Sequence, residues 1–213
     1  MVAVSCHPER SAQRGVEGSS AQIGVLALQG AFREHRLMLD GLGAATRLVR
    51  WPADLEGLDG LVIPGGESTA IAKLLAIHGM YEPLRAAHAA GMAVFGTCAG
   101  AILMARAIDG ARPDQEALAL MDVRIRRNAY GRQVDSFETT VPFDGVEGGP
   151  VKGVFIRAPR FADLGPGVEV LSRADDGEPL AVREGRALAV AFHPELTDDA
   201  RVHAFFLERV VGS

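Results

Sequence analysis

The sequence predicts an α/β fold of three layers, in which a mostly parallel central sheet is flanked by helices and carries a small antiparallel extension. Two observations support this prediction. In the first half of the chain, short apolar runs alternate with helical segments, and the connecting turns are short. Beyond Ala107 the pattern changes to short strand candidates separated by Gly and Pro, which is typical of an antiparallel extension rather than of further βα units.

The first half of the chain contains the parallel part of the predicted sheet. Apolar runs such as 23–28 are typical of strands buried on both faces, and the helical candidates follow them with apolar residues at helical spacing. Ser68 or Thr69 is expected to cap the helix that runs to about His78, because both carry a side-chain oxygen that can accept a backbone N–H. The predicted strands are 23–28, 46–50, 60–63 and 92–94, and the predicted helices are 32–42, 68–78, 82–90 and 101–105.

The second half is expected to add the antiparallel strands and a closing helix. The helix over 198–211 places Val202, Phe205, Phe206 and Val210 on one apolar face. The strand candidates are 134–138, 153–156, 168–171, 180–182 and 187–192.

Composition limits the class of protein. The chain has 213 residues, enough for one ordinary domain, and 48% of them are hydrophobic. Its formal charge of 22 − 27 = −5 argues against a nucleic-acid or anionic-membrane partner. No stretch approaches the roughly 20 apolar residues that span a bilayer. Cys6 and Cys98 do not resemble a disulfide framework, so a reduced, cytoplasmic setting is expected.

Residues 1–20 differ from the rest of the chain. They are polar, lack periodicity and have no apolar core of the kind found in signal peptides. Two interpretations remain open: a disordered N-terminal extension, or an upstream start that adds nothing to the fold. In either case we expect one domain over residues 21–213.

A cysteine on a sharp turn is the strongest functional signal. Gly96-Thr97-Cys98-Ala99-Gly100 follows an apolar run and precedes a helix, which is the strand, G-x-C-x-G and helix order of a nucleophile elbow. Glycines flank the nucleophile because larger side chains would clash in so tight a turn. The helix N-terminus directed at the sulfur favours the thiolate. This pattern predicts that Cys98 is a nucleophile.

A base and an orienting carboxylate follow near the other end of the chain. His193-Pro194-Glu195 comes directly after the apolar strand 187–192. A Cys, a His that takes its proton and a Glu that orients the His form a complete nucleophilic set. Glu67 is a rival carboxylate, but its context favours substrate binding or loop anchoring. We therefore predict Cys98, His193 and Glu195 as the catalytic residues.

Three loops are expected to meet at one edge of the sheet, because sites in open α/β sheets form beyond the carboxyl ends of the strands. They are 64–69, 96–100 and 193–195. Gly65 and Gly66 allow a close backbone approach and could direct an amide at a developing oxyanion. The Ala99 amide, which follows the nucleophile, would be a second donor.

The motifs together resemble those of the class I (triad) glutamine amidotransferases, and among them the glutaminase subunits of pyridoxal 5′-phosphate synthase. The resemblance covers about residues 22–211. Any single motif is weak evidence for it, whereas all of them in this order are strong evidence. They are LQGA at 28–31 with EH at 34–35, PGGEST at 64–69, GTCAG at 96–100, RNAYGRQVDSF at 127–137, FIRAP at 155–159 and HPE at 193–195.

This resemblance implies a flavodoxin-like fold and an activity. The enzyme would hydrolyse L-glutamine to L-glutamate and ammonia through a γ-glutamyl thioester on Cys98. The ammonia would pass to a pyridoxal 5′-phosphate synthase subunit, forming a hetero-oligomer. No metal or organic cofactor is implied, since pyridoxal phosphate would be a product made on the partner.

The resemblance also implies residue roles. Hydrolysis should be slow in the free subunit, because docking to the synthase is expected to complete the oxyanion hole by a rearrangement at Gly65-Gly66. Two roles remain open for Arg124, Arg126 and Arg132: they are either solvated charges or charges that face the partner. The glutamine-contacting residues would be Gly66, Glu67, Ser68, Arg127, Ile156 and Arg157, and the oxyanion hole would be formed by Gly65, Gly66 and Ala99.

Three other functions remain open for this chain. A cysteine peptidase could share the elbow, and an amidotransferase could serve anthranilate, carbamoyl phosphate or imidazole glycerol phosphate synthesis instead. A scaffold subunit that binds the synthase without hydrolysing glutamine is a third.

Among the other histidines, His35 is expected to support structure or the partner surface, and His203 is expected to be an ordinary surface or boundary residue.

Overall fold

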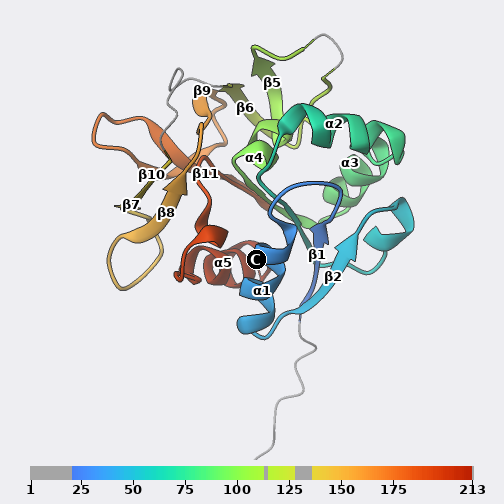
Figure 1. Cartoon of the computed structure of the whole chain (residues 1–213), viewed down its shortest axis with the longest axis horizontal. Coiled ribbons are helices and arrows are strands. Elements are labelled where there is room, and N and C mark those ends of the chain that lie inside the picture. Colours follow the sequence, from blue (N-terminus) through green and yellow to red (C-terminus); the bar gives the residue numbers. More distant parts are fainter. Residues whose placement is uncertain (1–20, 113–114, 128–135, 213) are drawn as a thin grey trace, which may run out of the picture.

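A computed structural model describes residues 21–112, 115–127 and 136–212 of the chain (Figure 1). The predicted extension over residues 1–20 lies outside these ranges, as do Arg132 and the first two residues of the predicted strand 134–138. The described residues form a seven-stranded sheet in the order β10-β11-β12-β4-β3-β1-β2. The described residues thus contain the central sheet that the sequence predicts.

Five neighbouring strands of this sheet are parallel, and two antiparallel strands extend one edge. β3, β4 and β12 are buried along their whole lengths, which explains why they appear in the sequence as continuous apolar runs. The parallel strands are β1 (Gln22–Leu26), β2 (Ala45–Val49), β3 (Gly60–Ile63), β4 (Ala93–Thr97) and β12 (Ala187–Val190); the antiparallel ones are β10 (Glu169–Arg173) and β11 (Pro179–Glu184).

Helices cover both faces of the sheet. Figure 1 shows α1 beside α5 on one side and α2 and α3 near α4 on the other, which gives the three predicted layers. The helices are α1 (Phe32–Gly41), α2 (Ser68–Ile77), α3 (Tyr81–Ala89), α4 (Ala99–Met104) and α5 (Arg201–Phe205), with short helical turns η1 (Pro52–Leu55) and η2 (Pro194–Leu196) and a π-helical turn η3 (Phe206–Val211).

Two helix predictions need correction. The side chain that caps α2 is Glu67, which accepts the N–H groups of Thr69 and Ala70, whereas Ser68 is already the first residue of the helix. The predicted closing helix over 198–211 is instead α5 followed by the π-helical η3. Its predicted apolar face is nevertheless buried, since Val202 and Phe206 have no exposed surface.

The strands beyond α4 are distributed more widely than predicted. β10 and β11 extend the central sheet, but β7 and β8 form a separate hairpin, and β5, β6 and β9 form a third sheet in which β5 and β6 are parallel. The strands β5, β6 and β9 are absent from the sequence prediction. Their bounds, with those of the hairpin, are β5 (Ala105–Asp109), β6 (Met121–Arg126), β7 (Phe137–Val141), β8 (Val151–Phe155) and β9 (Arg160–Leu164).

Within the ranges given above, no helix is long and apolar enough to cross a membrane.

Candidate active site

The loops after β3, β4 and β12 meet at one edge of the sheet because these three strands are adjacent and parallel. Together with residues 29–31 after β1 they surround a cavity of about 450 Å³. The convergence predicted from the strand ends is therefore present. The lining residues are Gln29, Gly30, Ala31, Gly65, Gly66, Glu67, Ser68, Cys98, Ala99, Ile102, Arg127, Ile156, Arg157, His193 and Leu196.

Cys98 occupies the turn between β4 and α4 in a conformation that few non-glycine residues adopt. Its φ of 47° and ψ of −100° lie outside the regions favoured by L-residues. Its backbone N–H donates to the Val190 carbonyl (2.9 Å), which ties the turn to β12. The side chain is 7% exposed, and Sγ lies 3.9 Å from the Ile156 carbonyl oxygen. The cysteine is thus a free thiol at the bottom of the cavity.

The tight turn requires glycine on both sides of Cys98. A Cβ on Gly100 would collide with the Ile63 carbonyl of β3, and one on Gly96 would come within 2.5 Å of Met104 Sδ. α4 therefore starts in direct contact with two strands of the sheet. This close packing holds the nucleophile in its strained conformation.

His193 and Glu195 form a hydrogen-bonded pair directly after β12. His193 Nδ1 lies 2.8 Å from Glu195 Oε1, and both side chains are almost completely buried. The backbone of His193 exchanges two hydrogen bonds with Val154 of β8, which fixes the loop. Because Nδ1 is taken by the carboxylate, Nε2 is the nitrogen that remains for Cys98.

The charges of the pair stabilise each other. Burial alone would lower the pKa of His193, but its interactions with Cys98 and Glu195 raise the pKa to about 10. Burial would also raise the pKa of Glu195, whereas the neighbouring His35 and His193 hold that pKa below its ordinary value. A protonated His193 beside an ionised Glu195 is therefore the favoured state near neutral pH.

Glu67 and Arg127 lie at the polar side of the cavity. The Glu67 side chain accepts N–H groups from Thr69 (3.0 Å) and Ala70 (2.7 Å) at the start of α2, and it contacts Arg127 Nη2 at 3.4 Å. Burial acts to raise the pKa of Glu67, but these hydrogen bonds lower it overall. Arg127 also donates to Gln115 and Thr69. Glu67 thus anchors a loop, as expected, and is not the carboxylate paired with His193.

In this structure the amide of Gly65, a predicted oxyanion-hole residue, is engaged elsewhere. Its N–H donates to Thr97 Oγ1 (2.9 Å), and its carbonyl accepts from the Ala31 N–H (3.1 Å). A Cβ at this position would collide with the His193 ring, which explains the glycine. Ala99 is the first residue of α4, where N–H groups have no partner within the helix.

The remaining predicted site residues fall into two groups. Gly66, Ser68, Ile156 and Arg157 line the cavity with Cys98, whereas Glu195 lies behind His193 rather than on the cavity wall. Arg157 has a φ of 47°, a second strained residue next to the cysteine. Arg124 pairs with Asp109 on the surface and is absent from the cavity lining.

Sequence reasoning missed the contribution of the loop after β1. Gln29 Oε1 accepts the Glu67 N–H at 2.9 Å and thereby positions the loop that carries Gly65 and Gly66. The signal was available, because residues 29–31 follow a buried parallel strand like the other site loops. His203 was also misjudged, since it is completely buried instead of lying at the surface.

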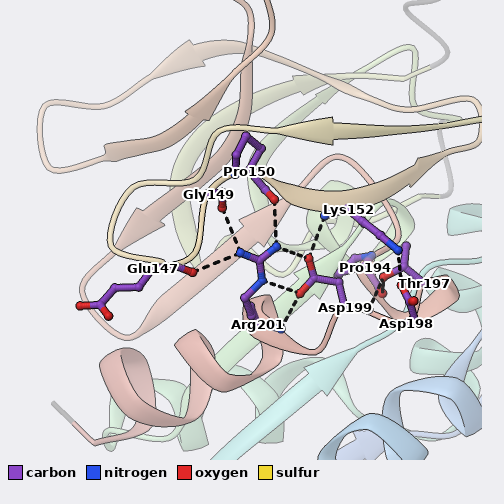
Figure 2. A network of polar contacts seen from close by, with 9 residues as sticks. All are labelled: Glu147, Gly149, Pro150, Lys152, Pro194, Thr197, Asp198, Asp199 and Arg201. Atoms are coloured by element: carbon purple, nitrogen blue, oxygen red, sulfur yellow. Dashed lines mark hydrogen bonds and ion pairs between the residues drawn. The ribbon is translucent and has the colours of Figure 1, made fainter.

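The segment after Glu195 is held to β8 by a polar network (Figure 2). Asp199 accepts the Lys152 N–H (3.0 Å) and the Nη2 group of Arg201 (2.6 Å). Arg201 in turn donates to the carbonyls of Glu147, Gly149 and Pro150. The start of β8 is thus tied to the chain that follows the His-Glu pair.

Comparison with known proteins connects this geometry to a family. The model of the SNO glutamine amidotransferase family matches residues 25–212. A pyridoxal 5′-phosphate synthase subunit PdxT of Corynebacterium jeikeium is 53% identical over 188 residues, which are 88% of this chain and 96% of that protein. The PdxT subunit of Frankia alni is 54% identical over 92% of this chain and 98% of its own length.

A solved structure of a glutamine amidotransferase has the same fold. It is 49% identical in sequence, superposes with a TM-score of 0.83, and the match covers 90% of this chain and 99% of the other. The fold and the sequence motifs therefore point to the same group of proteins.

Proposed function

The chain belongs to the SNO glutamine amidotransferase family, and we propose that it uses Cys98, His193 and Glu195 to supply ammonia to a pyridoxal 5′-phosphate synthase for vitamin B6 synthesis. As a member of this family it is a glutaminase, which hydrolyses L-glutamine to L-glutamate and ammonia. The single observation that carries the residue assignment is that His193, which is hydrogen-bonded to the buried Glu195, lines the same cavity as the strained Cys98.

The proposed first half-reaction forms a thioester. The Cys98 thiolate attacks the side-chain amide carbon of glutamine, and the C–N bond breaks as protonated His193 gives its proton to the leaving nitrogen. Ammonia leaves and a γ-glutamyl thioester remains on Cys98. Glu195 orients the ring and stabilises its charged form, as the carboxylate does in related triads.

Water completes the reaction. His193, now neutral, takes a proton from a water molecule, and the resulting hydroxide attacks the thioester carbonyl. The C–S bond breaks, and glutamate and the Cys98–His193 pair are regenerated. Each step uses side chains that lie in or directly behind the cavity.

The polar wall of the cavity suits a zwitterionic amino acid. An α-carboxylate calls for a guanidinium or backbone N–H groups, and Arg127 and Arg157 both line the cavity. An α-ammonium group calls for acceptors, which Glu67 and the Ile156 carbonyl can supply at the same wall. We propose Gly66, Glu67, Ser68, Arg127, Ile156 and Arg157 as the glutamine-binding residues.

The oxyanion hole is proposed to be completed on docking. The Ala99 amide at the start of α4 is the first donor, and Gly66 or a rearranged Gly65 supplies the second. In the free chain the Gly65 N–H is engaged by Thr97, so Gly65 cannot serve as that donor until the loop changes. Losing one such donor typically costs about 10²–10³ in kcat, which would keep the free subunit slow.

The partner in this proposal is a pyridoxal 5′-phosphate synthase subunit, by analogy with the PdxT relatives. Ammonia must reach it through a sealed route, because in water it would become ammonium and escape. We also propose a cytoplasmic location, where a reducing environment keeps the Cys98 thiol free.

The test is release of glutamate from L-glutamine by the purified chain, alone and with a synthase subunit. We expect strong stimulation by the partner, and a loss of about 10⁴-fold or more in Cys98→Ala. A peptide substrate and a mutant of the partner that cannot dock serve as controls. No release in either condition would overturn the proposal and favour the scaffold alternative, while cleavage of peptides but not of glutamine would favour a peptidase.

A further inference from the structure

Two buried histidines that the mechanism does not use lie behind Glu195. His35 comes from α1 and His203 from α5, and neither has any exposed surface. His35 Nδ1 lies 2.9 Å from His203 Nε2. On its other side, His35 Nε2 lies 3.1 Å from Thr97 Oγ1 and 3.5 Å from Glu195 Oε2. The hydrogen-bonded group at the site therefore extends well past the carboxylate.

The partners of these atoms decide which ring nitrogens carry protons. Glu195 Oε1 is taken by His193, and the described residues offer Oε2 no hydrogen-bond donor other than the long contact from His35 Nε2. A buried ionised carboxylate oxygen needs a donor. If His35 carries its proton on Nε2, that N–H can be shared between Thr97 Oγ1 and Glu195 Oε2, while Nδ1 accepts from the Nε2–H of His203.

The alternative tautomers are unfavourable. A proton on His35 Nδ1 would let Nε2 accept from the Thr97 hydroxyl, but it would also turn the Nε2 lone pair toward the ionised Glu195 and leave Oε2 with no donor among the described residues. It would also force the proton of His203 onto Nδ1, which has no hydrogen-bond partner among the described residues. A buried donor without an acceptor costs more than a ring nitrogen left as an unused acceptor. The network therefore has one favourable arrangement, with both rings neutral and protonated at Nε2.

Packing and burial support this arrangement. Phe95 contacts both rings edge-on, with centroids 6.1 Å from His35 and 5.6 Å from His203, which restricts their rotation. Burial lowers the pKa of His35 and lowers that of His203 to about 3, so both rings are neutral near neutral pH.

We infer that His35 is a positioning residue for the hydrolysis of glutamine: held by His203, it donates from Nε2 to the outer oxygen of Glu195 and so fixes the carboxylate against His193. The inference rests on the proposed role of Glu195. His193 and His35 then hold the carboxylate from both sides. We expect the contact of 3.5 Å to shorten when glutamine is bound, because hydrogen bonds in ligand-free sites often tighten only during the reaction.

A pair of variants of similar shape tests this role. In His35→Gln the amide nitrogen lies as many bonds from Cα as Nε2 does and can donate to Glu195, while its oxygen can accept from His203. In His35→Met the side chain has the same length and no donor. With the synthase partner present, we expect His35→Met to lose about 10–100-fold in kcat with KM changed less than about twofold. His35→Gln should stay within about threefold of the parent chain.

The melting temperature of both variants separates positioning from folding. The inference is overturned if the two variants lose the same activity, or if His35→Met, folded at the assay temperature, keeps full kcat. Because a substitution at a buried site can prevent folding, a second measurement uses the unaltered chain. Nuclear magnetic resonance of ¹⁵N-histidine-labelled protein reads the tautomers directly. Both His35 and His203 should be neutral with the proton on Nε2, and a proton on His35 Nδ1 overturns the inference.

The two proposals fail in different ways. An unaltered chain that releases no glutamate, or an active Cys98→Ala, would overturn the proposed function. An active parent chain, an inactive Cys98→Ala and an unaffected His35→Met would overturn the role of His35 alone.

Discussion

Cys98 shows how a single residue depends on its surroundings. Its positive φ costs about 1–3 kcal/mol relative to a relaxed conformation, so neighbouring contacts must enforce it. The N–H bond to Val190 and the absence of side chains at Gly96 and Gly100 provide that enforcement. In return the cysteine lines the cavity. The strain is part of the way in which the nucleophile is presented.

Glu195 allows a sharp prediction at the same scale. In Glu195→Gln the neutral amide no longer stabilises protonated His193, whose pKa is raised to about 10 in the parent chain. Activity needs this proton for the leaving nitrogen, so the rate falls as pH rises through the pKa of His193. We expect the descending limb of the profile of kcat/KM against pH to move to lower pH by about one unit or more, and kcat to fall about 10²–10⁴-fold.

Glu67→Gln is the matched control, because Glu67 is the other carboxylate near the cavity. It caps α2 and contacts Arg127, so its replacement should change KM and stability but leave the alkaline limb in place. The pairing of His193 with Glu195 would be contradicted if the descending limb of the kcat/KM profile stayed at the same pH in Glu195→Gln. An equal shift of that limb in both variants would contradict it as well.

At the scale of elements, the network around Asp199 makes the next prediction. Hydrogen bonds from Arg201 lower the pKa of Asp199 to about 2 from an ordinary value of 3.8. A carboxyl group whose pKa is lower in the folded than in the unfolded protein stabilises the fold at pH values above its unfolded pKa. This stabilisation is lost as the pH falls through its folded pKa. Asp199→Asn should therefore lower the free energy of unfolding by about 1–2 kcal/mol near neutral pH, since water partly screens the pair.

Asp198→Asn is the control for this change. Asp198 is mostly exposed and pairs with Lys152 at the surface, so its loss should leave stability almost unchanged. Thermal unfolding of both variants, followed from neutral pH down to about pH 2, provides the comparison. Equal stabilities for Asp199→Asn and the parent chain near neutral pH would contradict the structural role of the network.

The elements also show what a sequence can and cannot reveal. Parallel strands such as β3 and β4 were predicted because both faces are buried, which requires continuous apolar runs. β6 instead alternates buried residues with more exposed ones, and β9 has a single buried residue, Phe161, so neither forms such a run. Pairing in the small sheets depends on tertiary contacts, and the parallel pairing of β5 with β6 has no local signal.

The predictable part of the site consists of residues that come directly after buried strands. Cys98 and His193 were found because each directly follows a buried strand, and Gly65 because two glycines interrupt the chain after β3. His203 was not found, since nothing local distinguishes a buried histidine from a surface one on a short helix. Its place depends on α5 packing beside α1, which only the tertiary structure reveals.

At the scale of the whole molecule, catalysis and association are coupled in the proposed function. If docking reshapes the Gly65-Gly66 loop around glutamine, linkage requires glutamine to strengthen docking by the same factor. We expect L-glutamine to tighten binding of Cys98→Ala to the synthase subunit by about 5–150-fold, the usual range for such coupling. Calorimetric titration with and without L-glutamine measures it, and D-glutamine serves as the control. Unchanged affinity would mean that docking does not alter the glutamine site.

The most direct test of the central claim is to trap the intermediate on Cys98. The complex with the synthase subunit is mixed with radiolabelled L-glutamine and quenched in acid, and the labelled peptide is then identified by mass spectrometry. We predict a γ-glutamyl group on the peptide that contains Cys98, removable by hydroxylamine and absent from Cys98→Ala. Glutamate release without any label on Cys98, or a label on another residue, would contradict catalysis by this cysteine.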